Sequence, residues 1–464
     1  MTPGIELRGK RVLVVGLART GVSTAQFCAA RGARVTASDA RSAAQLGEIV
    51  GRLHEAGCTL EMGGHTIPTF LAQDLIVPSP GVPATLPGLL AAREAGIPMC
   101  SEIELASRFL RGRLVAITGS NGKTTTTALV AHILAGAGMP VIVAGNIGTP
   151  LISRVEDSTD RSVTVAEVSS FQLELIDSFR PDIAVLLNLT PDHLDRHASF
   201  DEYCRAKVRL FQNQTERDFA VLNADDPVVA RQAPSRPQIF WFSRSRRMAA
   251  GASLRDARIV FRDDRGETTL LDRSDIGLRG EHNVENVLAA ASTAWLSGAP
   301  ASAIAAGVRS FPGVEHRLEF VAEIGGVQFF NDSKATNVDA ALKALGAFPG
   351  GLLVILGGKD KGSDYAPLIE PLRQRARVVL LIGAAAEKIE AQIGASVPVE
   401  RAGTLDRALT LAWQRAQPGD TVLLAPACAS FDQFENYEHR GRSFKQLVRA
   451  LDTAHASAGP ARKE

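Results

Sequence analysis

The stretch "RLVAITGSNGKTTTT", residues 113–127, decides the fold. Its mostly apolar first part predicts a buried strand, and the residues from Lys123 onward predict a helix. A common phosphate-binding frame, G-x-x-x-x-G-K-[ST], would place glycine where this chain has Ile117, so the loop here begins at Gly119. Glycine turns at a helix N-terminus direct backbone amides and a partial positive charge toward phosphate. We therefore expect phosphate binding rather than an ordinary turn with a surface lysine, with Lys123 on the terminal phosphates and Thr124 on Mg²⁺.

The alternation of strand and helix patterns extends from this stretch in both directions. It predicts parallel α/β sheets in three domains, at residues 1–107, 108–312 and 313–464. The first and last are expected to be Rossmann-like, and the central one to be a P-loop-type ATPase domain. Between residues 240 and 280 the runs "IFWFSRSRR", "ARIVFRD" and "TTLLD" predict short antiparallel strands instead.

Composition excludes several functional classes. The chain has 464 residues, 45% hydrophobic and 22% charged, with a net charge of +1, which gives no electrostatic basis for binding nucleic acid or an anionic membrane. The five cysteines are scattered and form no C-x-x-C pair, which argues against disulfides and cysteine–zinc sites and favours a reducing cytosol. No stretch has the pattern of a signal peptide or a membrane span. We expect a soluble cytoplasmic protein.

Polar residues follow the predicted strands of the central domain, where ligands of parallel sheets bind. Glu167 ends "VTVAE" and is a candidate magnesium ligand, although a solvated glutamate is an equal alternative. His193 and His197 are four residues apart, a spacing that suits two metal ligands on one helical face, or simply polar residues near a helix start. Lys207 has apolar neighbours and is a candidate for partial burial, against the commoner case of a snorkelling lysine.

A second glycine turn lies in the first domain. The run from Gly16 to Gly21 follows "RVLVV", and Asp39 ends the next strand, an arrangement similar to a dinucleotide fingerprint. The middle glycine is replaced by Ala18, which crowds the approach of a pyrophosphate. The turn is therefore compatible with NAD or with another nucleoside diphosphate.

Three polar clusters follow predicted strands of the third domain: residues 331–337, 357–361 and 427–430. Together they predict a second ligand-binding rim, with Lys361 suited to a carboxylate and Lys334 to a phosphate. Cys428 is either a nucleophile or, more commonly, a buried free cysteine.

Nine segments in this order resemble one known family, the Mur ligases: "ITGSNGKTTTT", "AGNIG", "EVSSFQLE", "NLTPDHLDRH", "GEHNVENVLAA", "PGVEHRLE", "NDSKATN", "GGKDKG" and "PACASFDQF". The resemblance covers nearly the whole chain and is greatest to the D-glutamate-adding branch. It implies a UDP-binding, an ATPase and a C-terminal domain. It also implies that the chain uses ATP to add D-glutamate to UDP-N-acetylmuramoyl-L-alanine through an acyl phosphate, in cytoplasmic peptidoglycan precursor synthesis. We expect a monomer without nucleic-acid or membrane partners.

The resemblance also implies roles for individual residues. The expected catalytic and metal-binding residues, for a pair of Mg²⁺ ions, are Lys123, Thr124, Glu167, His193 and a carbamylated Lys207. The expected ATP contacts are Gly119, Ser120, Asn121, Gly122, Lys123, Thr124, Thr125, Asn286, Arg317, Asp332 and Lys334. The expected contacts of the UDP substrate are Arg19, Thr20, Asp39, Ser79, Pro80, Gly81 and Asn146. The expected contacts of D-glutamate are Thr336 and Lys361 for its α-carboxylate, and Ser430 and Tyr437 for its side chain.

Two positions depart from the family pattern. Ala425 stands where serine is expected near the glutamate pocket, and Ala40 stands where threonine can stand beside the uracil. Three other functions remain open at this point: a folylpolyglutamate synthetase-like amide ligase, an NAD-dependent oxidoreductase built on the Gly16–Gly21 turn, and a nucleotide-binding regulator without catalysis. The sequence leaves open which enantiomer of glutamate is used.

Overall fold

The structure is a computed structural model, and it describes residues 6–146, 148–193, 196–263 and 266–458. The chain divides into two compact units. One contains the residues up to Asp275 together with Asn286–Ser310, and the other contains Ile276–Glu285 together with the chain from Phe311 onward. The boundaries expected at residues 107 and 312 stay predictions.

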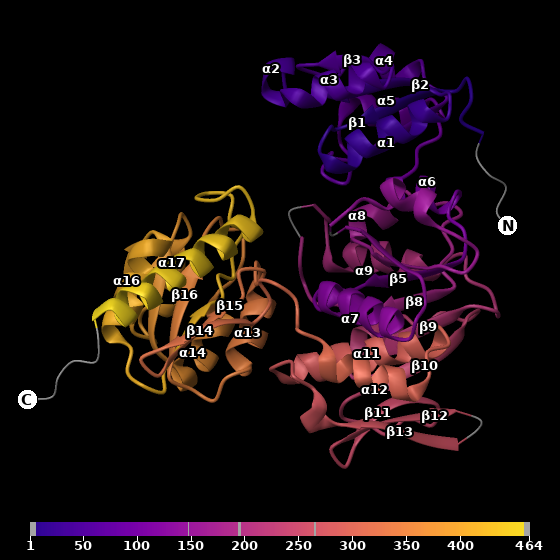
Figure 1. Ribbon diagram of the computed structural model, residues 1–464. Coiled ribbons are helices and arrows are strands. Elements are labelled where there is room, and N and C mark those ends of the chain that lie inside the picture. Colours follow the sequence, from indigo (N-terminus) through magenta and orange to yellow (C-terminus); the bar gives the residue numbers. More distant parts are fainter. Residues whose placement is uncertain (1–5, 147, 194–195, 264–265, 459–464) are drawn as a thin grey trace, which may run out of the picture. The chain divides into compact units, whose positions relative to one another are not determined.

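The first sheet lies in the indigo part of the chain in Figure 1 and has four parallel strands in the order β3-β2-β1-β4. Side chains of β1 alternate between two apolar clusters, with Val12 and Val14 in one and Leu13 and Val15 in the other, because successive strand residues face opposite sides. Its elements are β1 (Arg11–Val15), α1 (Arg19–Ala30), β2 (Arg34–Asp39), α2 (Ala43–Leu46), α3 (Glu48–Glu55), β3 (Thr59–Met62), α4 (Ile67–Leu71), β4 (Leu75–Pro78), α5 (Pro87–Glu94) and α6 (Glu102–Ser107).

The second sheet has nine strands in the order β13-β12-β11-β10-β9-β8-β5-β7-β6. The predicted strand and helix around residue 118 are both present, as β5 and α7. The elements of this part are β5 (Arg113–Thr118), α7 (Lys123–Gly136), β6 (Val141–Gly145), η1 (Leu151–Asp157), β7 (Val163–Glu167), α8 (Ser170–Leu173), β8 (Ile183–Leu186), α9 (Phe200–Val208), η2 (Arg209–Phe211), β9 (Phe219–Asn223), α10 (Pro227–Arg231), β10 (Gln238–Ser243), β11 (Gly251–Arg255), β12 (Arg258–Asp263), β13 (Gly266–Asp272), η3 (Arg273–Asp275), α11 (Glu281–Leu296) and α12 (Ala301–Ser310).

The prediction of antiparallel strands between residues 240 and 280 is partly wrong. β10, which contains "IFWFS", pairs in parallel with both β9 and β11. Only the pairs β11–β12 and β12–β13 are antiparallel among the described strands of this region. Aromatic and β-branched residues favour a strand but carry no information about its direction, so the pairing had to come from the tertiary structure.

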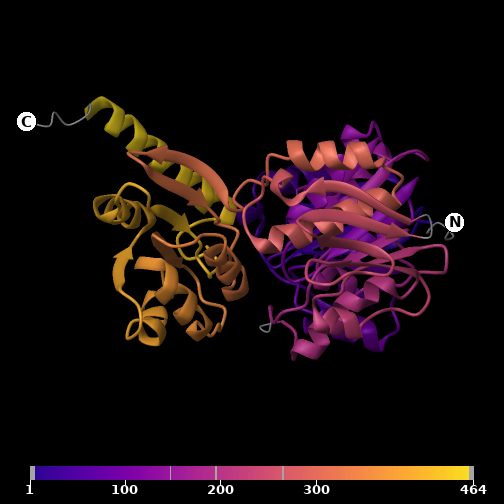
Figure 2. The same cartoon turned by 90° about the horizontal axis from the view of Figure 1, so that it is seen from below.

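The third sheet, in the second unit, has the order β14-β15-β19-β16-β17-β18, and all its pairs are parallel except β14–β15. Helices α13, α14 and α15 cover one face and α16 and α17 cover the other (Figure 2). The elements are β14 (Glu319–Ile324), β15 (Val327–Asn331), α13 (Val338–Gly346), β16 (Leu352–Gly357), η4 (Ala366–Leu368), α14 (Ile369–Arg375), β17 (Ala376–Ile382), α15 (Ala386–Ile393), β18 (Val399–Gly403), α16 (Leu405–Arg415), β19 (Thr421–Leu424) and α17 (Tyr437–Ala458).

Two further observations bear on the sequence-based expectations. All five cysteines are buried and free, including Cys428, for which burial was the commoner expectation. Across the part of the chain that is described, no helix is both long and apolar enough to cross a bilayer. The predicted fold class, three α/β domains with mainly parallel sheets, is confirmed by the three sheets.

Candidate active site

The loop between β5 and α7 needs its two glycines. Gly122 has φ 87° and Gly119 has φ 152°, a region that favours glycine. A Cβ on Gly122 would lie 2.2 Å from the side-chain oxygen of Asn286, which is buried on α11. The N-cap of α7 is Gly122, which has no side chain to cap the first turn, and amides at a helix N-terminus lack partners within the helix. The arrangement is that of an anion-binding helix N-terminus, and it places Asn286 beside the loop.

The neighbouring strand fixes the shape of this loop. Asn121 donates its amide hydrogen to Asn188 Oδ1 at 2.8 Å, and Asn188 Nδ2 donates to Asn121 O at 3.0 Å. The hydroxyl of Ser120 lies 2.9 Å from that of Tyr203 and donates to Thr190 O at 2.8 Å. The sequence analysis missed Asn188 and Tyr203. Their signals were present, because Asn188 closes the run "IAVLLN" and Tyr203 lies one helical turn before Lys207.

Oxygen atoms gather where β7 ends beside β5. Glu167 is 2% exposed, and its carboxylate accepts a hydrogen bond from the Thr124 hydroxyl at 3.0 Å. Asn146 donates to the other carboxylate oxygen at 3.1 Å. A hydroxyl and a carboxylate at this separation are hard oxygen donors of the kind that Mg²⁺ prefers, so the chemistry of these residues fits that ion. The structure therefore brings Thr124, Glu167 and Asn146 together at the phosphate loop.

Two lysines share one backbone carbonyl of the loop. Lys123 Nζ donates to Gly119 O at 2.8 Å and to Ser120 O at 2.8 Å, and Lys207 Nζ donates to Gly119 O at 2.9 Å. Lys207 is 2% exposed and lies 4.7 Å from the ring centroid of Tyr203. Burial, and then the charge of Lys123, lower the pKa of Lys207 well below its usual value. The expected partial burial of Lys207 is thus confirmed.

The two histidines do not share a helical face. His193 has φ 55°, and α9 begins only at Phe200. The ring of His193 packs edge-on against Phe171 at 5.0 Å, whereas the ring of His197 stacks on Phe171 at 5.4 Å. His197 is 2% exposed, and its Nε2 lies 3.0 Å from the Ser170 hydroxyl. The two histidines therefore do not lie on a regular helix, and their roles as metal ligands stay predictions.

The first sheet orders the turn expected to hold the UDP part. Asp39 accepts the amide hydrogen of Leu17 at 2.7 Å and a two-pronged contact from Arg41. Burial alone would raise the pKa of Asp39, but the Arg41 and Leu17 hydrogen bonds lower it to about 2. Ser79 donates to Gly16 O at 2.6 Å, which joins the two turns. Arg41 was missed, and its adjacency to Asp39 in sequence was the available signal.

Ser79 and Pro80 line a pocket of about 250 Å³ with Phe171 and Arg196. The Arg196 guanidinium lies 4.6 Å from the Phe171 ring centroid and donates to the carbonyls of Pro80, Gly81 and Val82 at 3.2 to 3.4 Å. Arg19, which begins α1 just before Thr20, donates to Gly148 O at 2.6 Å. The expected UDP residues on the first sheet therefore lie around the two turns at Gly16 and Ser79, whereas Asn146 lies beside Glu167.

In the second unit, the residues expected near the nucleotide lie at the end of β15. Asp332 is 1% exposed, and burial raises its pKa to about 6 although Arg317, 3.8 Å away, acts in the opposite direction. Lys334 lies 5.2 Å from the ring centroid of Tyr437. The side chains near one another within this unit are therefore Arg317, Asp332, Lys334 and Tyr437.

The residues expected to bind D-glutamate lie after β15, β16 and β19, which are neighbours in the sheet. Thr336 follows the turn at Asp332, Lys361 is half-buried after β16, and Ser430 is 2% exposed after β19. Among the described residues, no carboxylate pairs with Lys361. Ala425 is fully buried at the end of β19, whereas Ala40 is exposed after β2.

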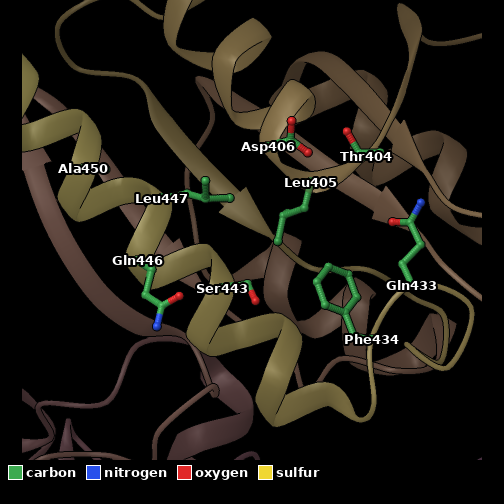
Figure 3. Close-up of a pocket in the computed structure, with 9 residues that line it drawn as sticks. All are labelled: Thr404, Leu405, Asp406, Gln433, Phe434, Ser443, Gln446, Leu447 and Ala450. Carbon is green, nitrogen blue, oxygen red and sulfur yellow. The ribbon is translucent and has the colours of Figure 1, made fainter.

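Two other features of the second unit do not add to this site. Glu315, His316 and Glu319 are the one group in the described chain with metal-ligand spacing, but the Lys445 ammonium already pairs with both carboxylates. A pocket of about 710 Å³ lies between α16 and α17, where Leu405, Phe434 and Leu447 face the same hollow (Figure 3). None of the predicted ligand-binding residues lines it.

The chain matches family models along most of its length. Residues 10–101 match the MurD-like N-terminal domain of Mur ligases, residues 117–294 the Mur ligase middle domain, and residues 316–428 the glutamate ligase domain of Mur ligases. An Acidobacterium capsulatum protein named UDP-N-acetylmuramoylalanine–D-glutamate ligase is 56% identical over 96% of this chain and 97% of its own length. One of the same name from Koribacter versatilis is 53% identical over 96% and 99%.

Solved structures have the same fold at low sequence identity. A pseudomurein peptide ligase type C from Methanothermus fervidus has a TM-score of 0.60 at 20% identity and covers 96% of this chain and 100% of its own. The MurF ligase from Thermotoga maritima, in complex with ADP, has a TM-score of 0.60 at 17% identity and covers 96% of both chains.

The family models and the relatives of 53% and 56% identity define an ATP-dependent ligase with three α/β domains. The chain belongs to the Mur ligase family. An NAD-dependent oxidoreductase is excluded by this membership, since the Gly16–Gly21 turn lies within the MurD-like N-terminal domain. The roles expected for the individual site residues stay predictions.

Proposed function

We propose that this chain joins D-glutamate to UDP-N-acetylmuramoyl-L-alanine at the expense of ATP, in cytoplasmic peptidoglycan precursor synthesis and as a monomer. The relatives of 53% and 56% identity carry the name of that activity. A carboxylate does not react with an amine at neutral pH, because its leaving group would be oxide. Transfer of the γ-phosphoryl group of ATP to the alanine carboxylate releases ADP and gives an acyl phosphate. The glutamate amine then attacks the acyl carbon, and phosphate leaves.

The pairing of Thr124 with Glu167 and the convergence of two lysines on Gly119 O carry this proposal. Phosphoryl transfer requires positioning and neutralisation of charge more than covalent chemistry from the protein. Lys123, beside the loop, would turn from the carbonyls of Gly119 and Ser120 to the terminal phosphates. Mg²⁺ on Thr124 and Glu167 would neutralise phosphate charge, and a second ion near His193 and Lys207 belongs to the same proposal.

Lys207 supports the proposed carbamate. Its lowered pKa favours the neutral amine, and a neutral amine adds CO₂ to give a carbamate with loss of one proton. The product is an anionic oxygen ligand beside Lys123. Lys207→Ala should lose most activity, about 10²-fold or more as for the loss of one electrostatic group in an active site. Short carboxylic acids should restore part of it.

The carbamate test has a matched control in Lys10→Ala, an exposed lysine before β1, which should keep full activity and show no response to the acids. Full activity of Lys207→Ala without any additive would contradict the role of Lys207.

The proposed reaction is tested by ADP release from ATP. Release should require both UDP-N-acetylmuramoyl-L-alanine and glutamate, and comparing the two enantiomers shows whether D-glutamate is preferred. Release with a folate substrate instead, or release that does not respond to any amino acid, would overturn the assignment.

A further inference from the structure

Two loops of the second unit are hydrogen-bonded to each other, and each carries a predicted ligand-binding residue. One loop, residues 358–363 after β16, carries Lys361, and the other, residues 427–430 after β19, carries Ser430. Lys359 and Ala429 exchange backbone hydrogen bonds of 2.8 and 3.1 Å. Gly358 has φ 138°, and a Cβ there would lie 2.2 Å from Ala429 O. The backbones of the two loops are therefore in direct contact. Whether the loops are held rigidly together depends on the side chains packed against them.

A partly buried hydrogen-bond chain runs between the same loops. Tyr365 is fully buried, and its hydroxyl donates to Asp360 Oδ1 at 2.7 Å and lies 3.0 Å from Cys428 Sγ. Asp360 also accepts from Lys388 Nζ at 2.7 Å, at Oδ2. Each atom of this chain thus has a partner on another segment, so Asp360, beside Lys361, is tied to Cys428, two residues from Ser430.

The protonation states of Tyr365, Cys428 and Asp360 determine which group donates each hydrogen bond. Burial raises the pKa of Tyr365, and the Cys428 and Asp360 groups raise it further, so the phenol keeps its proton. Burial raises the pKa of Cys428 to about 11, which keeps it a thiol and argues against the nucleophile considered from the sequence. Burial also acts to raise the pKa of Asp360, but hydrogen bonds from Lys388 and Tyr365 outweigh it and lower that pKa. The phenol therefore donates to the carboxylate, and the thiol donates to the phenol oxygen.

Further hydrogen bonds hold the loop that carries Ser430, residues 427–430. Arg440 is fully buried on α17 and donates to Cys428 O at 3.2 Å and to Ser333 O at 2.9 Å. The main-chain oxygen of Ser430 accepts from the amides of Gln433 and Phe434. Neither loop can move without breaking buried hydrogen bonds.

We propose that Asp360, Tyr365 and Cys428 are positioning residues that fix the spacing between Lys361 and Ser430 and thereby select an amino acid with glutamate's distance between its two carboxylates. This inference rests on the proposed function, in which Lys361 holds the α-carboxylate and Ser430 the side-chain carboxylate. Aspartate is shorter by one methylene, and a rigid site rejects such an analogue by about 10- to 200-fold. A site whose loops move independently accommodates both lengths.

Tyr365→Phe tests the proposal, because it removes the one oxygen that contacts both loops and keeps the ring. We expect the KM for D-glutamate to rise about tenfold, as for the loss of one to two buried hydrogen bonds. The ratio of kcat/KM for D-glutamate over D-aspartate should fall by a similar factor, while the KM values for ATP and the UDP substrate stay unchanged. A purely structural loss would lower activity toward all three substrates together.

Tyr203→Phe is the matched control, since its hydroxyl contacts Ser120 in the phosphate loop. It should raise the KM for ATP and leave the aspartate discrimination unchanged. Asp360→Asn keeps an acceptor for Tyr365 and should keep the discrimination, whereas Asp360→Ala should lose it; this pair serves equally if Tyr365→Phe does not fold. An unchanged glutamate-to-aspartate ratio in Tyr365→Phe or Asp360→Ala overturns the inference. Absence of glutamate-dependent ADP release in the unmodified protein instead overturns the proposed function, and the inference with it.

Discussion

Two buried glutamates on α6 are predicted to respond to pH in opposite directions. Glu102 is 1% exposed, its Oε1 accepts the amide hydrogen of Ile152 at 2.6 Å, and its Oε2 lacks a hydrogen-bond partner among the described residues. Burial raises the pKa of Glu102 from 4.5 to about 7. Glu104 is equally buried but accepts from Ser178, Arg108 and three consecutive backbone amides. Burial acts to raise the pKa of Glu104, and these hydrogen bonds outweigh it and lower that pKa.

The sign of each effect follows from linkage. For Glu102 the folded pKa lies above the unfolded one, so its contribution is complete below pH 4.5 and is lost as the pH rises through about 7. The interval between those pKa values corresponds to about 3 kcal/mol, at about 1.4 kcal/mol for each pKa unit. For Glu104 the folded pKa lies below 4.5, so its contribution is present above that pH and is lost as the pH falls through the folded pKa.

The prediction compares Glu102→Gln with Glu104→Gln. Between pH 4.5 and pH 8, the free energy of unfolding of Glu102→Gln should gain about 3 kcal/mol relative to the parent protein. That of Glu104→Gln should be lower than the parent's at pH 8, and the deficit should shrink toward acid pH. The comparison uses the change in the free energy of unfolding between two pH values. Any effect of the glutamine amide that does not depend on pH therefore cancels.

Urea unfolding followed by tryptophan fluorescence measures both variants. The chain has three tryptophans. In a Trp413→Phe background the remaining Trp241 and Trp295 both lie in the first unit, which contains α6. A Glu102→Gln difference that does not change with pH, or changes of the same sign in both variants, would refute the assignment of opposite pKa shifts.

Two substitutions test the phosphate loop. Lys123→Ala should abolish turnover while calorimetry still detects binding of the UDP substrate; near-normal turnover would contradict its role. Gly122→Ala places a Cβ 2.2 Å from Asn286 Oδ1 at φ 87°, so ATP affinity should fall about 5- to 30-fold, since the left-handed conformation alone costs about 1–2 kcal/mol. Gly136→Ala, with nothing within 4 Å of its added Cβ at the end of the same helix, should bind ATP normally; equal effects of the two would exclude the close contact as the cause.

The sequence predicted the local parts of the molecule well. The strand, glycine turn and helix at residues 113–127 are local, because hydrophobic period and glycine conformation decide them. The direction of β10 was wrong, and β11, "GASLR", was not predicted, since glycine, serine and arginine give no strand signal. Strand direction and weak strands depend on partners elsewhere in the chain.

The site shows the same limit. The sequence placed Lys207 among apolar residues, but its lowered pKa also depends on Lys123, which is far away in sequence and meets it at Gly119 O. Tyr203 was missed for a related reason, since its hydroxyl matters only because α9 packs beside the loop and brings it to Ser120. A sequence pattern identifies residues that can be charged or can form hydrogen bonds. Which residues become their partners depends on how the helices and strands pack.

For the predicted glutamate site, the fact that the sequence did not supply is the order of the strands in the third sheet. Its loops follow β15, β16 and β19, and the sheet order puts β19 between the other two. The loops at residues 332–336, 358–361 and 427–430 therefore adjoin, because parallel strands end at one edge of the sheet. β19 is the last strand among the described residues, so its insertion between β15 and β16 has no counterpart in the linear order of the motifs. That insertion brings Cys428 to Tyr365 and makes the spacing between Lys361 and Ser430 a property of the sheet rather than of either loop.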